Sequence, residues 1–452
     1  MNWINPYKNR KGAWLKGNLH THSGEGMTQD EIFSTYGKLG YDFICISDHR
    51  KLTLPKPPKG NRILVLPGFE WNSKTGDHMN MISFDCPTLV RSAASQDTEK
   101  VLKSLKKKPV LVVMNHPNWR EPPHYSRETL YERSLSCEGL EIYNGLVDFG
   151  AGAALATEKW DYLLSRRRMV LGFANDDAHS LKHIGQAWNV VRAASRTPRA
   201  ILTAIKEGNF YCSTGATFDD IRREGTRITV SSPDAQEIWA IGEWGARMEK
   251  VLSNRMEFDF ATVQSAHAKY VRFVAFGKGA AMAWTQPFLK EPNVEDRRLS
   301  PFVAQWSVSN LLSMPLGEVT DATARDETLT WKPLRTVAVP EGFATVTELH
   351  GTANGIALLS ARISVARSGR WITALGHDGG ARLFVDGRLV IDQPVRSNPA
   401  NPDRSKIELS LKKGQHSVLV ALNTDHGKGQ GVFLRFILPG KAPKKPVFPV
   451  SV

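Results

Sequence analysis

The segment Lys16-Gly-Asn-Leu-His-Thr-His-Ser23 contains two histidines, His20 and His22, with one residue between them. In an extended chain, residues two positions apart point to the same side, so both imidazoles can reach one cation. The same spacing recurs at Asp177 and His179, within Asn-Asp-Asp-Ala-His. Two such pairs rarely arise by accident. They predict a metal centre built at strand ends.

Further candidate ligands follow other apolar segments. His49 comes after Ile-Cys-Ile-Ser-Asp, Glu70 after Leu-Pro-Gly-Phe, and His116 after Val-Val-Met-Asn. His78 stands in Gly-Asp-His, a setting that fits a turn as well as a ligand. The carboxyl ends of parallel strands open at one face of an α/β barrel, which would gather these side chains. The predicted ligands are His20, His22, His49, Glu70, His78, His116, Asp177 and His179.

This donor set predicts a multinuclear centre. Imidazole and carboxylate ligands suit zinc, manganese or iron, and a carboxylate such as Glu70 is able to bridge two ions. We therefore expect two or three divalent transition-metal ions. The acidic and amide neighbours Asp48, Asn115 and Asp176 are candidates to orient the imidazoles, although Asp48 and Asp176 fit turns or caps equally well.

Apolar, β-branched segments alternate with amphipathic ones to about residue 210. Helix starts are indicated by Thr28 with Glu31, by Asp97 with Thr98, and by Thr197-Pro198. Alternating units of this kind predict an α/β fold, either a barrel or a doubly wound sheet. The expected strands are Asp42–Ile46, Ile63–Leu66, Met79–Phe84, Val110–Met114, Leu140–Tyr143 and Met169–Phe173.

Beyond Thr214 the pattern changes to short alternating segments broken by Gly, Pro and Asn, which is typical of β-sandwiches. A charged, proline-containing stretch, Lys290 to Ser300, separates a small β region from a larger one. We therefore expect three domains in the 452 residues: 1–215, 216–290 and 291–452.

Composition gives only partial information about the binding partners and the cellular compartment of the protein. Lys plus Arg number 59 against 45 for Asp plus Glu, a net charge of +14 that favours anionic partners. The basic residues are scattered, so no specific nucleic-acid site is expected. No run of about twenty apolar residues predicts a membrane span, and the first residues lack the apolar stretch of a signal peptide. A processed secreted protein would look the same, so the compartment stays open. The four cysteines, without close pairing, are expected to be buried free thiols.

Taken in order, the motifs resemble those of the PHP (polymerase and histidinol phosphatase) superfamily. They are Gly-Asn-Leu-His20-Thr-His22-Ser, Ile-Ser-Asp48-His49, Pro-Gly-Phe-Glu70, Asn-His116-Pro and Asp177-Ala-His179. The resemblance covers residue 14 to about residue 215. It implies a distorted seven-stranded (β/α) barrel with a trinuclear metal site.

The resemblance also implies a division of the ligands. His20, His22, Glu70 and Asp177 would bind one ion, and Glu70 would bridge to a second near His78 and His116. His49 and His179 would complete the cluster. One departure is the shortened Ser23-Gly-Glu25-Gly26, where the family usually has Ser-Asp-Gly or a later histidine. Glu25 is either a substitute ligand or an exposed loop residue.

Later segments resemble more specialised relatives. Gly208-Asn-Phe-Tyr-Cys-Ser-Thr-Gly215, Tyr270-Val-Arg-Phe-Val and Ala283-Trp-Thr-Gln-Pro-Phe288 are similar to the carbaryl-hydrolase branch of PHP proteins. Gly376-His-Asp-Gly-Gly-Ala-Arg-Leu-Phe-Val-Asp-Gly387 resembles PA14 or galactose-binding-like sandwiches. Its Val-Asp-Gly is also an ordinary hairpin turn. The last domain is therefore either a carbohydrate-binding module or a structural one.

The expected activity is metal-dependent hydrolysis, most readily of a phosphoester, with a metal-activated water as nucleophile. The substrate would be a small anionic or ester compound, carbohydrate-linked if the last domain binds sugars. Carboxylic-ester or carbamate hydrolysis is the alternative, and a sugar-binding protein with a vestigial barrel is a second one. Trp71 and Trp119 are candidates for a pocket wall or for core packing. The expected catalytic residues are Asp48, Arg120 and His183, and further candidates for anion binding or proton donation are Lys74, His124 and Lys182.

Overall fold

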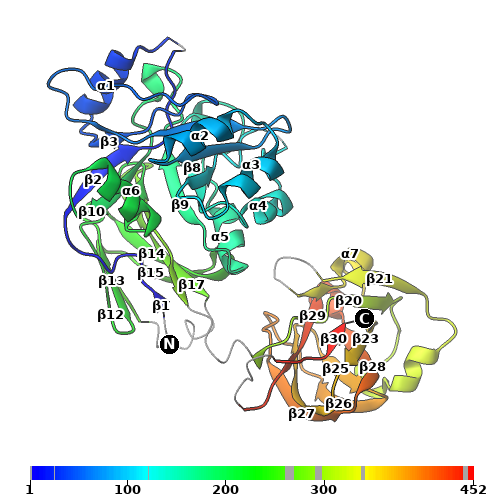
Figure 1. The fold of residues 1–452 in the computed structure, drawn as a ribbon. Helices are drawn as coiled ribbons and strands as arrows, with labels where there is room; N and C mark the ends of the chain where they lie inside the picture. The colour runs from blue at the N-terminus through cyan, green and yellow to red at the C-terminus, as the bar shows by residue number, and fades with distance from the viewer. Residues whose placement is uncertain are drawn as a thin grey trace. The chain divides into compact units, whose positions relative to one another are not determined.

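The computed structural model describes residues 3–24, 26–120, 122–259, 269–290, 298–336, 342–440 and 446–451. The chain forms two compact units, Met1–Glu291 and Pro292–Val452 (Figure 1). The expected boundary between residues 215 and 216 stays a prediction, and strands on both sides of it share one sheet.

That sheet has eleven strands, in the order β1-β19-β17-β18-β11-β10-β2-β3-β4, with β14 joined to β17 and β15 to β14. Strands β2, β3 and β4 run parallel, whereas β10 is antiparallel to both β2 and β11. The bounds are β1 Trp3–Ile4, β2 Ala13–Asn18, β3 Phe43–Ile44, β4 Leu64–Val65, β10 Trp188–Ala193, β11 Phe210–Ser213, β14 Glu237–Ile241, β15 Arg247–Val251, β17 Tyr270–Phe276, β18 Met282–Thr285 and β19 Phe288–Lys290.

A second sheet has five strands in sequence order: β5 Gly68–Asn72, β6 His78–Ile82, β7 Leu111–Met114, β8 Gly139–Asn144 and β9 Leu171–Asn175. Strands β7, β8 and β9 are parallel. Strand β6 is antiparallel to both β5 and β7. The short turn after Asn72 accounts for the β5–β6 pairing, since a connection this short can only join antiparallel strands.

The expected seven-stranded (β/α) barrel is not confirmed. In the described residues the two sheets are separate and open, and the chain is mixed α/β. Two isolated parallel bridges, Thr21 to Ala178 and His49 to Glu70, connect one sheet to the other, and the Asn189 side chain on β10 is hydrogen-bonded to the Ala174 backbone on β9. All six expected strands are present, each displaced by a residue or two; Met79–Phe84, for example, is observed as His78–Ile82.

The predicted helix starts are confirmed. Thr28 and Glu31 form a capping box, and the side chains of Asp97 and Thr197 accept hydrogen bonds from the first turns of their helices. The helices of this unit are α1 Gln29–Lys38, α2 Cys86–Ala93, α3 Thr98–Leu105, α4 Arg127–Arg133, α5 Thr157–Ser165 and α6 Pro198–Lys206. One apolar core joins both sheets, with Phe43, Phe69 and Phe173 among its fully buried members.

A small antiparallel sheet, β12 Asp220–Glu224, β13 Arg227–Ser231 and β16 Arg255–Asp259, completes the unit. A buried ion pair connects strand β17 of the eleven-stranded sheet to helix α5. Asp161 on α5 accepts hydrogen bonds from Arg272 at 2.8 and 2.6 Å and from the Tyr270 hydroxyl at 2.7 Å. All four cysteines are free, as expected, although Cys86 is only half-buried. Among the described residues, no helix is long and apolar enough to cross a membrane.

The second unit consists of two antiparallel sheets and the short helix α7 Thr347–His350. Its apolar core draws on both sheets, for example Leu359 and Leu383 from one and Leu375 and Leu434 from the other. The expected Asp-Gly turn lies between β25 and β26, where Asp386 and Gly387 have φ of 48° and 79°. The strands are β20 Gln305–Ser309, β21 Trp331–Arg335, β22 Ala344–Thr345, β23 Ile356–Val365, β24 Gly369–His377, β25 Ala381–Val385, β26 Arg388–Gln393, β27 Ser405–Leu411, β28 Gly414–Asn423, β29 Gly431–Ile437 and β30 Val450–Ser451.

Candidate metal centre

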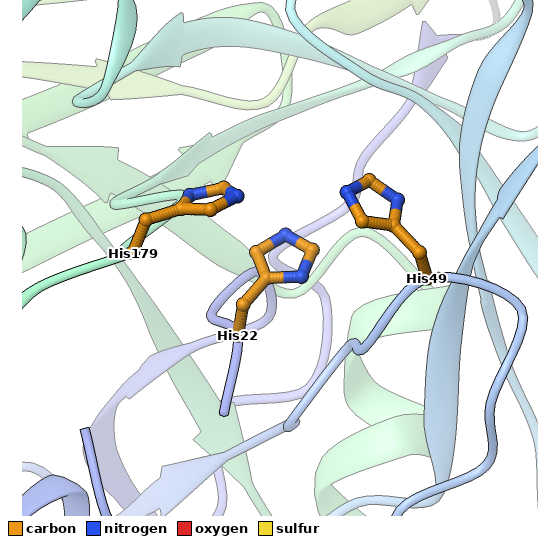
Figure 2. Close-up of side chains that lie close together, drawn as sticks. All are labelled: His22, His49 and His179. Carbon is orange, nitrogen blue, oxygen red and sulfur yellow. The ribbon is translucent and has the colours of Figure 1, made fainter. Parts of the chain in front are cut away.

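The predicted ligands in the described residues lie together at one site. The two spaced pairs are adjacent, because the Asp177 amide donates to the His20 carbonyl and the His22 amide donates to the Ala178 carbonyl, both at 2.9 Å. Figure 2 shows His22, His49 and His179 converging from separate segments. Not every ligand follows a strand: Glu70 lies within β5 and His78 begins β6. Glu25 lies outside the described residues.

Two ligands have a backbone conformation that L-residues rarely adopt. The φ angles are 30° at His116 and 51° at Asp177. Such conformations cost free energy and persist where the surrounding structure holds them, often at functional sites. Here they occur two residues after β7 and β9, where the His116 side chain faces Glu70 and the Asp177 side chain faces His20 and His22.

Glu70 is the centre of the cluster and is 1% exposed. Its Oε2 lies 3.4, 3.3 and 3.1 Å from nitrogens of His20, His22 and His49. Its Oε1 lies 3.0 and 3.2 Å from nitrogens of His78 and His116. The two carboxylate oxygens therefore face two different groups of histidines, which is the arrangement that a bridging carboxylate requires.

Asn115 fixes this orientation. Its side-chain nitrogen donates to Glu70 Oε1 at 2.9 Å and to the side chain of Asn80 at 3.2 Å. The sequence predicted that Asn115 would orient an imidazole. It instead orients the carboxylate.

Asp177 supplies the second carboxylate of the buried side. Its Oδ1 lies 3.1 Å from His20 Nε2 and 3.2 Å from His22 Nε2. These three atoms are buried and make no hydrogen bond within the described part of the chain. Unpartnered buried polar atoms are costly. Three that converge from imidazole and carboxylate groups fit a divalent transition-metal ion.

Glu141, on β8, was not identified from the sequence. Its fully buried carboxylate accepts hydrogen bonds from His20 Nδ1 at 2.8 Å and from the His116 amide at 2.7 Å. The side chains of Asn144 and Asn175 also donate to it, at 2.9 and 2.8 Å. Because His20 Nδ1 carries this hydrogen, the Nε2 lone pair is free to coordinate. An acidic residue inside the apolar strand Gly-Leu-Glu-Ile-Tyr was the available signal.

His124 has the equivalent role for His116. Its Nε2 donates to the carbonyl of Gly76, so its Nδ1 is the acceptor for a hydrogen bond from His116 Nδ1 at 3.1 Å. Burial and the neighbouring His116 lower the pKa of His124 to about 3, so the ring is neutral. With its single hydrogen on Nδ1, the His116 ring would present its Nε2 lone pair to Glu70 Oε1, 3.2 Å away. Two lone pairs that face each other need a cation between them.

The charge balance of the cluster agrees with this assignment. Burial alone would lower the pKa values of His20 and His22, but the adjacent carboxylates outweigh it and raise both, that of His22 to about 9. The same imidazoles hold the pKa values of Glu70 and Asp177 well below their usual range, against the effect of burial. The cluster thus requires positive charge. Divalent cations would supply it and displace protons from the imidazoles.

The described residues offer three overlapping groups of ligand atoms close enough to hold an ion: His20, His22 and Asp177; His49, Glu70 and His78; and His22, His49 and His179. The His179 ring is oriented by a hydrogen bond between its Nδ1 and the Asp177 carbonyl oxygen, at 2.9 Å. The three groups differ in burial. The first is fully buried, and the other two include partly exposed histidines.

The residues predicted to be catalytic lie around the cluster in different settings. Asp48 accepts hydrogen bonds from the amide and hydroxyl of Ser23 at 2.7 and 2.8 Å, and it contacts Thr53. It therefore anchors the loop after His22 and orients no imidazole there. Asp176 likewise binds the Tyr36 hydroxyl and three amides of residues 185–187. Both carboxylates thus hold loops.

Arg120 and His183 stay candidates for a catalytic role. Arg120 is exposed and its guanidinium lies 3.7 Å from the centre of the Trp119 ring. His183 accepts a hydrogen bond from the His179 amide at 3.3 Å. Lys74 and Lys182 are exposed. Trp71 is fully buried and belongs to the core, whereas Trp119 is half-buried against His116 and His78.

Comparison with known families adds one match. Residues 163–210 match the PHP-associated family. This segment contains the ligands Asp177 and His179, and it supports the resemblance to the PHP superfamily. The carbaryl-hydrolase branch and the PA14 or galactose-binding-like resemblance stay predictions. No curated protein is significantly similar to the chain.

Three solved structures are among the similar ones. A two-domain protein containing a predicted PHP-like metal-dependent phosphoesterase from Bacteroides vulgatus has a TM-score of 0.36 and 14% identity, over 64% of this chain and 92% of its own. PsfC from Pseudomonas syringae has a TM-score of 0.33 and 12% identity, over 42% and 87%. A lesion-specific endonuclease from Pyrococcus furiosus has a TM-score of 0.32 and 16% identity, over 43% and 56%. Values this low say nothing about activity by themselves.

Proposed function

We propose that the protein is a metal-dependent phosphoesterase that uses two or three divalent transition-metal ions. The observation that carries the proposal is the convergence of unpartnered buried atoms, His20 Nε2, His22 Nε2 and Asp177 Oδ1, beside a carboxylate that faces a second group of histidines. Bound divalent ions would lower the pKa of a water molecule and neutralise phosphoryl charge.

The chain's own residues would prepare this chemistry. Glu141 and His124 fix the imidazoles of His20 and His116 with their coordinating nitrogens inward. Asn115 holds Glu70 between the two groups. Because these supports are buried or packed, the ligands need little reorganisation when an ion binds.

The choice of a phosphoester rests on charge around the cluster. Arg120 and Lys182 are exposed cations on the segments that carry His116 and Asp177. They would attract an anionic substrate, and either could neutralise a phosphoryl oxygen. His124 is unsuited to donate a proton, because its ring is neutral and both nitrogens are engaged. His183, with one ring nitrogen outside the contact with His179, is the better candidate to protonate the leaving oxygen.

An assay of the metal-loaded protein tests the proposal. Phosphomonoesters, phosphodiesters, aryl carboxylic esters and carbamates would be compared, with a chelated sample and a sample reloaded with zinc or manganese as controls. We expect turnover of a phosphoester that disappears on chelation and returns on reloading. Turnover of carboxylic esters or carbamates alone would support the carbonyl chemistry instead. No turnover by a fully metallated protein would contradict both.

A further inference from the structure

Two aromatic side chains border the metal ligands. The Trp119 ring centre lies 5.1 Å from that of His116 and 6.0 Å from that of His78. The Phe149 ring centre lies 4.9 Å from that of His183, which accepts the amide hydrogen of His179. The Trp119 ring thus contacts predicted ligands directly, whereas the Phe149 ring contacts His183, which binds the backbone of the predicted ligand His179.

A single segment connects the two rings. Residues 145–156 follow β8, and their middle pairs with the loop that carries Trp119: Arg120 donates its amide to Ala151 at 2.9 Å, and Ala153 donates to Asn118 at 3.1 Å. The approach is so close that a Cβ at Gly152 would lie 2.2 Å from the Asn118 carbonyl oxygen, so only glycine fits.

The start of this segment is tied to a metal ligand. The Asn144 side chain donates to Asp177 Oδ2 at 3.2 Å and accepts from the Val147 amide at 3.1 Å. The first amide of the 3-10 helix Val147–Phe149 is therefore bonded to Asn144, whose side chain also binds the predicted ligand Asp177. The hydrogen bonds of Asn144 therefore fix the position of Phe149 relative to the metal cluster.

The exposure of Phe149 needs an explanation. The ring is 52% exposed. His78, which lies beside Trp119, and His179, whose amide binds His183, are themselves partly exposed, at 19% and 23% of the side chain. The two aromatic rings therefore border the solvent-facing side of the cluster, where a substrate would enter. An apolar ring held in that position is suited to contact a bound molecule.

We propose that Phe149 and Trp119 form the binding surface for a planar aromatic ring in the alcohol part of the phosphoester. This inference rests on the proposed function. Phe149 would stack on the ring, and Trp119, already covered on one side by the Arg120 guanidinium at 3.7 Å, would close the other flank. The preferred substrates are accordingly aryl or heteroaryl phosphoesters, and aliphatic ones bind less tightly.

Binding of non-hydrolysable phosphonates to the metal-loaded full-length protein tests this. Calorimetry would compare methylphosphonate, cyclohexylmethylphosphonate and benzylphosphonate, the last two being similar in size and different in planarity. We expect benzylphosphonate to bind roughly three- to tenfold more tightly than the cyclohexyl compound, the usual worth of an aromatic contact. Phe149→Leu should remove most of this preference and leave methylphosphonate binding unchanged.

Phe149→Leu is the decisive variant, because the exposed ring touches no proposed ligand directly and its loss should not affect folding. Leu252→Ala, which alters an exposed apolar side chain after β15, is the matched control and should keep the preference. Equal binding of the two larger phosphonates by the wild-type protein, or an undiminished preference in Phe149→Leu, would overturn the inference while leaving the proposed function intact. Failure of all three phosphonates to bind would overturn both.

Discussion

The buried and the solvent-facing sides of the metal cluster are built differently. On the buried side, His20, His22 and Asp177 are at most 4% exposed, and Glu141 fixes the ring of His20. On the other side, the side chain of His49 is 44% exposed and that of His78 19%. The ligands of the buried half are therefore held in place by the core, whereas those of the exposed half depend on the conformation of loops. We expect the buried half to retain its ion more firmly.

The largest effect should come from Glu70, whose two carboxylate oxygens face histidines of both halves. Glu70→Gln replaces a bridging oxygen by an amide, so both groups of histidines lose a shared anionic ligand. We expect turnover to fall to background and the metal content to fall by more than one ion per chain, measured by elemental analysis. Glu99→Gln, at an 83% exposed side chain, is the control. A loss of one ion or less would contradict the bridging role.

The support of the buried half is tested at Glu141. Glu141→Gln keeps the shape but weakens the acceptor for His20 Nδ1, so we expect metal affinity to fall by roughly 10–100-fold. Glu138→Gln, three residues earlier and bonded to the Val112 amide at 3.0 Å, should have no such effect. The metal affinities of both variants are measured by competition with a chelator whose absorbance changes when it binds metal. Equal affinities for the two variants would mean that the buried half does not need this carboxylate.

A ligand of the exposed half should be less critical. His78→Ala removes one of the two histidines facing Glu70 Oε1, and His116 remains at 3.2 Å. We expect partial metal occupancy and reduced turnover, with the buried ion retained. Elemental analysis of the variant beside Glu70→Gln gives the comparison. If the two variants lost metal equally, the two halves would not be separable.

The loop of the exposed half is held by Lys159. Its ammonium donates to the carbonyls of Pro117 at 2.6 Å and Tyr125 at 2.8 Å, the two ends of the loop that carries Trp119 and His124. Lys159→Met should loosen this loop and lower turnover several-fold, with a smaller change in metal content. Lys103→Met, on the exposed face of α3, is the matched control. Unchanged turnover in a folded Lys159→Met protein would argue against this positioning role.

The smallest effect on the chemistry is expected from the second unit. All proposed ligands lie within Met1–Glu291, so a fragment of these residues should retain turnover of a small phosphoester if circular dichroism shows that it is folded. A folded, fully metallated fragment without activity would show that Pro292–Val452 supplies a catalytic group.

The clustering of the candidate ligands could be predicted because each is a metal-binding residue type in a recognisable local motif. The supports could not, because they depend on contacts between distant segments: Glu141 meets His20 across 121 residues, and Tyr36 meets Asp176 across 140. The same limit applies to the fold. Apolar periodicity located the strands, but it does not record their direction, so the antiparallel orientation of β6 was not predicted.

The β5–β6 hairpin also bears on how the protein folds. Glu70 and His78 are only eight residues apart and sit on paired strands, so their contact closes a short loop. His20 and Asp177 come from opposite ends of the α/β region, and their meeting requires a long loop to close at a greater entropic cost. A chain emerging from the ribosome would thus bring Glu70 and His78 together early. The firmer, core-supported side can form only after β9 has been synthesised.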